Sequence, residues 1–177
     1  SESGSAICAD TLLSVVVRHS ESSTAIRALA VLLVTCLTAA AAQVSVPLPF
    51  TPVPFTLQPM IVLVGGAALG ARLGLVSQIL YLTAGIAGLP VFAASPVLPQ
   101  GFLRLLGPTG GFLMAYPVAA FVTGWLGERG FDRRYLTSVA AMAAGLSLLF
   151  AFGIVWFAWF ASPAPVGLPK ALQLALY

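Results

Sequence analysis

The sequence predicts an all-α integral membrane protein, built as a compact bundle of transmembrane helices. Hydrophobic residues make up 59% of the 177 positions and charged residues only 7%, whereas a soluble domain carries about 25% charged residues. Apolar runs alternate with short turns, and each run approaches the roughly 20 residues that a membrane helix needs. A chain of this length accommodates five or six such helices.

A polar, serine-rich leader over residues 1–23 precedes a single transmembrane domain over residues 24–177. The leader is expected on the cytoplasmic side. The expected spans are about 25–43, 56–71, 75–92, 109–127 and 136–161, with a partial span at 168–177.

The first span leaves two questions open. Arg27, the apolar run after it and Ala40-Ala-Ala42 also fit a secretory signal with an A-x-A cleavage site. Small residues at spacings of three and four on this span permit the close approach of another helix. That helix belongs either to the same chain or to a partner.

Five prolines fall between Val46 and Pro59. Each proline fixes φ, removes a backbone donor and biases the preceding residue away from helix. A backbone without internal hydrogen bonds cannot face lipid and must lie against protein or line a cavity. Because mostly Val, Leu and Phe separate the prolines, we expect an extended lid over a pocket; a plain tight connector is the alternative.

Glycine and proline separate the later spans. Gly70-Ala-Arg-Leu-Gly74 is expected to form a short basic turn, and Gly88-Leu-Pro-Val-Phe92 to end the third span. A longer loop then leads to Thr109-Gly-Gly-Phe112, which opens the fourth span, and Pro117 is expected to kink that helix. A charged turn over Glu128–Arg134 precedes the fifth span, which is rich in aromatic residues.

The loop charges predict the orientation. If the N-terminus is cytoplasmic and successive spans cross the membrane in alternating directions, only Arg104 and Lys170 of the basic residues lie on the outer side. The basic residues on the inner side are then Arg18, Arg27, Arg72, Arg129, Arg133 and Arg134. Because positive residues gather on the cytoplasmic side, we expect a multi-pass protein of the inner (cytoplasmic) membrane, with the proline-rich lid on the outer face.

Arg104 is the strongest candidate for a ligand contact. It lies five residues before Thr109, where a helix is expected to begin and where free N–H groups carry a partial positive charge. Gly110 and Gly111 would let a ligand approach that backbone. The pattern favours a carboxylate or phosphate site, although an arginine exposed to solvent also fits this position.

The sequence lacks the residues that several kinds of catalytic or metal site need. The chain has two cysteines and one histidine, too few for a metal site, and the two cysteines have no metal-binding spacing. None of the five acidic residues falls within an expected span, and the Gly-x-x-x-x-Gly-Lys phosphate loop is not found. We therefore expect no enzymatic activity, no metal or cofactor and no nucleic-acid partner.

Three motifs together resemble the BioY family of biotin transporters, which are S components of energy-coupling factor (ECF) vitamin transporters. The motifs are Val46-Pro-Leu-Pro-Phe-Thr-Pro-Val-Pro-Phe-Thr-Leu-Gln58, Tyr81-Leu-Thr-Ala-Gly-Ile-Ala-Gly-Leu-Pro-Val-Phe92 and Leu106-Gly-Pro-Thr-Gly-Gly-Phe112. The resemblance covers about residues 25–165. It implies a six-helix bundle in the lipid bilayer that captures biotin from the outer face. A transmembrane coupling subunit and two ATPase subunits, which alone use ATP, would drive import.

The resemblance also implies roles for individual residues. Arg104 matches an arginine that the family places before its Gly-Pro-Thr-Gly-Gly run, and with Thr109 and Gly110 it would meet the carboxylate of biotin. The fused ring would need apolar walls and a few amide-type partners. The candidates for these are Phe50, Phe55, Gln58, Gln78, Tyr81 and Tyr116. Buried tyrosines and glutamines that bond only to neighbouring helices are the alternative.

One family motif is missing. The family closes with a Pro-Phe…Pro-Gly-Asp…Lys motif that opens the sixth helix, and this motif is not found before Tyr177; Lys170 is not its lysine. We therefore expect a truncated sixth helix or a diverged ending, and weaker binding. Two further functions stay open: an S component or small transporter for another anionic vitamin, and a membrane scaffold without a ligand.

Overall fold

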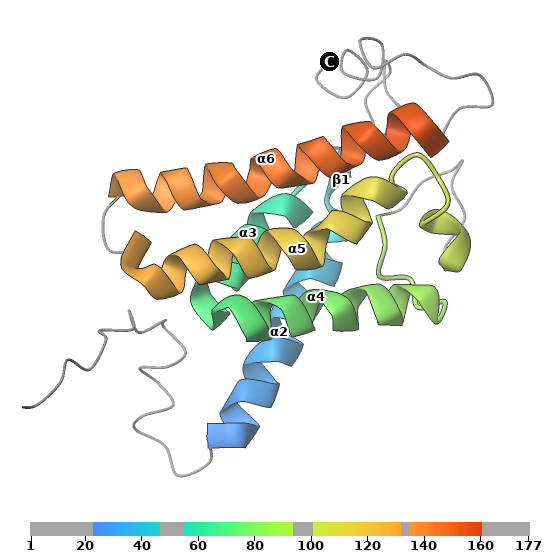
Figure 1. Cartoon of the computed structure of the whole chain (residues 1–177). Helices are drawn as coiled ribbons and strands as arrows, with labels where there is room; N and C mark the ends of the chain where they lie inside the picture. The colour runs from blue at the N-terminus through green and yellow to red at the C-terminus, as the bar shows by residue number, and fades with distance from the viewer. Residues whose placement is uncertain (1–22, 47–54, 94–100, 132–134, 161–177) are drawn as a thin grey trace, which may run out of the picture.

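The computed structural model describes residues 23–46, 55–93, 101–131 and 135–160. This part of the chain is a helical bundle (Figure 1). Its α-helices are α2 (Ser23–Gln43), α3 (Gln58–Leu69), α4 (Ala71–Ile86), α5 (Gly110–Leu126) and α6 (Tyr135–Phe160). The shorter elements are the strands β1 (Ser45–Val46) and β2 (Phe55–Thr56), the 3-10 turn η1 (Phe102–Arg104) and the π-turn η2 (Gly127–Phe131).

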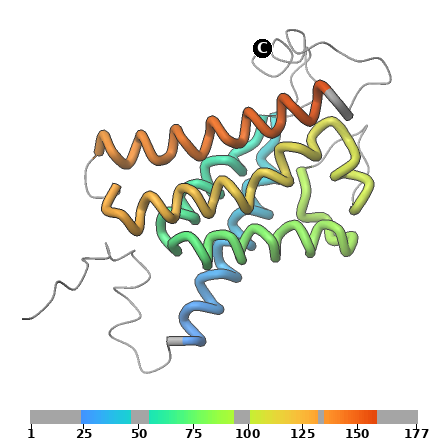
Figure 2. The backbone as a smooth tube through the Cα atoms, viewed as in Figure 1, coloured from blue at the N-terminus to red at the C-terminus, as the bar shows by residue number. Residues whose placement is uncertain are grey.

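Helix α5 lies at the centre of the bundle. It packs against α3, α4 and α6, while α2 packs on α3 and α4. In Figure 2, α4, α5 and α6 run roughly alongside one another and α2 crosses them. The inner face of α5 carries small residues, and Ala115, Ala119 and Ala120 are fully buried. Small residues allow membrane helices to approach until their backbones touch.

Three of the described helices are long and apolar enough to cross a membrane, namely Thr24–Gln43, Gly110–Phe131 and Tyr135–Ala158. The first, second, fourth and fifth expected spans lie within two residues of α2, α3, α5 and α6. Helices α3 and α4 have only 12 and 16 residues. At about 1.5 Å per residue they measure about 18 and 24 Å, less than the roughly 30 Å of a hydrocarbon core.

The corner between α3 and α4 consists of one residue. Gly70 has φ 86° and ψ 174°, a conformation that glycine adopts without strain. The turn expected over Gly70–Gly74 is therefore wrong, because Ala71 already begins α4. Glu128 caps this helix, since its Oε1 accepts the Ala71 N–H at 2.9 Å, and a carboxylate stabilises a helix N-terminus.

The third span also ends earlier than expected. Helix α4 stops at Ile86 rather than at Phe92. Beyond it the chain leaves the helix, and the Phe92 ring lies against Gly85, where a side chain would overlap it. After α4 the chain thus folds back against the end of the helix. The local sequence pattern did not predict this packing.

The two ends of the proline-rich stretch form an antiparallel pair. Ser45 pairs with Thr56 and Val46 pairs with Phe55, a short ladder that the sequence did not predict. The expected lid over residues 47–54, the sequence from Asp132 to Arg134 and the partial span at 168–177 lie outside the described residues. Pro117 lies inside α5, and the kink expected there stays a prediction.

The bundle should be sensitive to added volume where backbones touch. A Cβ at Gly124 would lie 2.5–2.7 Å from backbone atoms of Gly70, Ala71 and Gly66, so Gly124→Ala should lower stability by about 1–3 kcal/mol. The measurement is the thermal unfolding midpoint in detergent.

Gly127→Ala is the matched control. Its added Cβ would lie 3.4–4.0 Å from the Ala67 backbone, which is ordinary contact, and its effect should be small. Equal midpoints for the two variants would contradict the close approach at Gly124.

Candidate functional site

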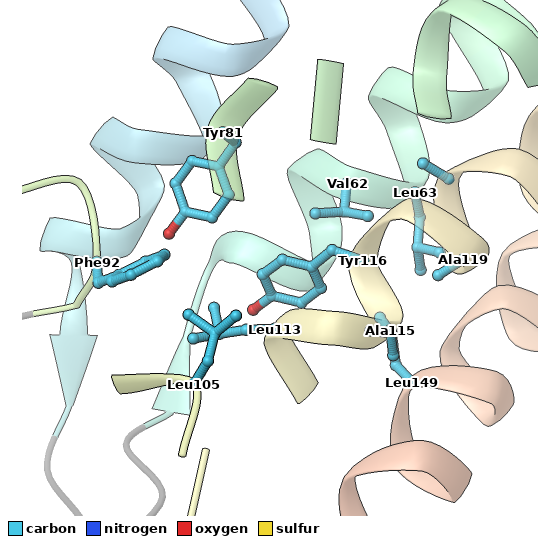
Figure 3. Packing of buried hydrophobic residues seen from close by; sticks show 11 residues of the cluster. Val62, Leu63, Tyr81, Phe92, Leu105, Leu113, Ala115, Tyr116, Ala119 and Leu149 are labelled. Atoms are coloured by element: carbon cyan, nitrogen blue, oxygen red, sulfur yellow. The ribbon is translucent and has the colours of Figure 1, made fainter. Parts of the chain in front are cut away.

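An aromatic cluster forms where α4, α5 and the segment after α4 meet (Figure 3). The Tyr81 and Phe92 rings meet edge to face with centroids 5.6 Å apart, and Tyr116 lies tilted against Tyr81 at 6.4 Å. All three side chains are at most 4% exposed. Aromatic pairs at these separations attract one another beyond simple burial, so the cluster provides a rigid apolar wall.

A directed series of hydrogen bonds crosses this cluster. Thr56 Oγ1 donates to Gln58 Oε1 at 3.4 Å, and Gln58 Nε2 donates to the Tyr81 hydroxyl at 2.6 Å. Tyr81 in turn donates to the Val91 carbonyl at 3.1 Å. The series therefore ties β2, α3, α4 and the segment after α4 together.

Arg104 lies beside this cluster as a buried cation. Only 2% of the residue is exposed, and its Nη2 donates to the Ala93 carbonyl at 2.8 Å. Burial lowers the pKa of the Arg104 guanidinium, because desolvation disfavours the charged form, while its interaction with the Tyr81 hydroxyl opposes this shift. Arginine nevertheless stays charged in proteins, so the site holds a positive charge away from water.

Side chains from three elements hold the segment Pro90–Ala93. Gln43 Nε2, at the end of α2, donates to the Pro90 and Phe92 carbonyls at 3.3 and 3.4 Å. Together with the bonds from Tyr81 and Arg104, every backbone carbonyl of this segment accepts a side-chain hydrogen bond. Gln43 was not among the residues predicted from the sequence, because its contacts lie 47 and 49 residues away.

The N-terminus of α5 adds a second polar element near Arg104. Thr109 is the N-cap residue, yet its side chain makes no capping hydrogen bond. Its Oγ1 is buried and has no partner among the described residues, and Thr109 is 7% exposed. The first N–H groups of a helix also lack acceptors within it. Hydroxyl and amide donors thus gather at this helix end.

The glycines at this helix end are explained by packing. A side chain at Gly110 would overlap the Leu105 carbonyl, and one at Gly111 would overlap Trp156. Packing therefore accounts for their small size, and the access for a ligand expected from the sequence stays a prediction. The site role expected for Gly110 itself stays a prediction.

The structure separates the other candidates. Gln78 points toward α2, where its Nε2 donates to Thr38 Oγ1 at 3.3 Å, and its buried Oε1 has no partner in the described part of the chain. Phe55 is 65% exposed, and Phe50 lies outside the described residues. Gln58, Tyr81 and Tyr116 do lie together. Thr56, Phe92 and Trp156 were missed, although Thr56 and Phe92 stand within the quoted motifs.

Comparison with known proteins identifies the family. Residues 16–177 match the family described as BioY. The chain belongs to the BioY family. A probable biotin transporter BioY from Pyrococcus horikoshii is 41% identical over 146 residues, which cover 82% of this chain and 80% of that protein. A biotin transporter BioY from Thermotoga maritima is 38% identical over 120 residues, 68% of this chain and 67% of that protein.

A solved structure shares the fold of this BioY-family chain. It is the crystal structure of the S-component for biotin from an ECF-type ABC transporter, with a TM-score of 0.78. The match covers 89% of this chain and 82% of that one at 21% identity. The resemblance drawn from the three motifs and the mostly helical fold are thereby confirmed. The chain is a multi-pass membrane protein, and the six-helix arrangement stays a prediction.

Removal of the Tyr81 hydroxyl should cost stability, because it interrupts the series between Gln58 and Val91. Tyr81→Phe leaves the buried Gln58 amide and the part-buried Val91 carbonyl each short of one partner, and buried groups of this kind cost about 1–3 kcal/mol. The thermal unfolding midpoint in detergent should fall accordingly.

Tyr135→Phe serves as the control, because Tyr135 is 84% exposed and its variant should unfold like the wild type. A double variant with Gln58→Leu should lose less than the sum of the single losses, since both changes break the same bond. Additive losses would show that Gln58 and Tyr81 are not coupled.

Proposed function

We propose that this protein captures biotin at the outer face of the cytoplasmic membrane as the S component of an ECF-type transporter. The observation that carries the proposal is a buried arginine, Arg104, which lies beside an aromatic cluster and five residues before a helix N-terminus, in a chain that belongs to the BioY family. Its relatives are named biotin transporters, and a biotin S-component shares its fold. The protein is a transport subunit and not an enzyme.

Arg104 and the start of α5 suit the carboxylate of biotin. A guanidinium binds a carboxylate through two parallel hydrogen bonds, and a helix N-terminus attracts anions through its free N–H groups. Thr109 Oγ1 is a buried hydroxyl at the same helix end. In the proposed complex the ligand carboxylate takes hydrogen bonds from Arg104 and from Thr109, and it lies beside Gly110 at the first turn of α5.

The aromatic cluster suits the neutral fused ring of biotin. Small-molecule sites are mostly apolar, with a few polar groups that fix the orientation of the ligand. Tyr81 and Tyr116 offer ring faces, and Gln58 offers an amide at the same place. In this proposal Phe50 and Phe55 contribute from the proline-rich loop, which covers the pocket. Gln78 contributes its Oε1 on the side of α2.

The arrangement of charge supports the orientation. Helix α4 begins at the Gly70 corner, close to Arg72 and Glu128, and ends at the segment that contacts Arg104. Arg104 and the corner therefore lie toward opposite ends of α4. With the corner on the cytoplasmic side, the N-terminus is cytoplasmic and the proposed site faces outward. A transmembrane coupling subunit and two ATPases then complete the transporter.

Equilibrium binding of biotin to the purified protein in detergent tests the proposal. Arg104→Ala should weaken binding by more than about tenfold, because a hydrogen bond to a charged group contributes about 1.5–3 kcal/mol. Isothermal titration calorimetry gives both dissociation constants.

Arg72→Ala is the matched control, since Arg72 is exposed at the start of α4 and should not affect binding. Tight binding that Arg104→Ala leaves unchanged would keep biotin as the ligand but exclude Arg104 as the carboxylate partner. Failure of the wild-type protein to bind biotin would remove the biotin proposal, and binding of another anionic vitamin would replace it.

A further inference from the structure

Trp156 on α6 reaches across to the loop that precedes α5. Its Nε1 donates to the Gly107 carbonyl at 3.0 Å, and the indole is half-buried. A tryptophan N–H away from water usually finds a hydrogen-bond acceptor. Here the acceptor is a backbone atom 49 residues away in sequence, so this one bond joins α6 to the loop before α5.

Gly107 is the middle link between Arg104 and the start of α5. The Gly107 N–H donates to the Arg104 carbonyl at 3.2 Å, and the Gly110 N–H donates to the Gly107 carbonyl at 3.0 Å. The Gly107 carbonyl therefore accepts from both Gly110 and Trp156, which uses both of its lone pairs. A shift of Gly107 would change the position of Arg104 relative to the helix end.

Trp156 also contacts the first turn of α5 directly. A side chain at Gly111 would overlap Cβ and the ring of Trp156, so the helix backbone lies against the tryptophan. Gly107 and Gly111 stand two residues before and two residues after Thr109. The same side chain thus holds the chain on both sides of the buried Thr109 hydroxyl.

We infer that Trp156 is a positioning residue for the carboxylate end of the proposed site. By holding Gly107 and the first turn of α5, it sets Arg104, Thr109 and the helix N–H groups in one arrangement. The inference rests on the proposed function and deepens it. Trp156 itself does not contact the ligand in this proposal, but it contributes to the preference for an anionic ligand.

Trp156 should affect the binding of only one end of the ligand, the carboxylate. A carboxylate bound by several donors at once depends on their mutual geometry, because a displacement of about 1 Å loses part of the interaction. The aromatic cluster around Tyr81 is held by its own hydrogen bonds to Gln58 and Val91. Loss of the Trp156 bond should therefore weaken recognition of the carboxylate and spare recognition of the ring.

Binding of biotin and of biotin methyl ester to Trp156→Phe tests this separation. Phenylalanine keeps an aromatic ring beside Gly111 but has no N–H for Gly107. Affinity for biotin should fall about threefold to tenfold, the range of one lost hydrogen bond, and affinity for the ester by less than about twofold. Calorimetry on one protein preparation gives both constants, so a partly unfolded sample affects both ligands alike.

Trp125→Phe is the control. Trp125 lies near the other end of α5, where the Arg129 guanidinium stacks on it at 3.2 Å, and its loss should leave both affinities unchanged. Equal weakening of both ligands in Trp156→Phe would indicate a merely structural role and overturn the inference, as would no weakening of either. A wild-type protein that binds the ester as well as biotin would refute the carboxylate site itself, and with it any positioning role. A wild-type protein that binds neither ligand would refute the proposed function.

Discussion

Close approach of helix backbones is the constraint on which the bundle depends. Lipid offers little hydrophobic driving force between helices, so their association relies on van der Waals contact and hydrogen bonds. Gly66 lies against the Ala120 backbone, and Gly124 lies against the corner at Gly70. These contacts hold α3 and α4 directly on α5. As a result Gln58, Tyr81 and Tyr116, which come from three helices, meet in one place.

The polar groups of the candidate site follow from the same environment. A buried polar group without a partner is costly in a medium of low polarity, and Gln58, Tyr81 and Val91 satisfy one another. A buried cation is more costly still and is retained in membrane proteins mainly where it has a function. Arg104 combines deep burial with a position beside the aromatic cluster, which is why it anchors the proposed function.

Length and apolarity allowed part of this structure to be predicted. Helices α2, α5 and α6 are long apolar runs, and their bounds followed from the sequence within two residues. The bounds of α4 did not, because the positive φ of Gly70 and the packing of Phe92 on Gly85 are not visible in local hydrophobicity. The rotation of each helix about its axis could not be predicted either, so Gln78 and Tyr81 were equivalent candidates for a ligand contact. In the structure Gln78 points toward Thr38. Trp156 was predicted only as one of the many aromatic residues of the fifth span, since its partner Gly107 is distant in sequence.

The carbonyls of Pro90–Ala93 have a dynamic consequence. This short segment is secured by Gln43, Tyr81 and Arg104, which belong to three different elements. Each bond restricts the φ and ψ angles of the residues beside it, so the loss of one bond weakens the restraint on its neighbours. The segment should therefore detach cooperatively, as a single unit, rather than fray from one end.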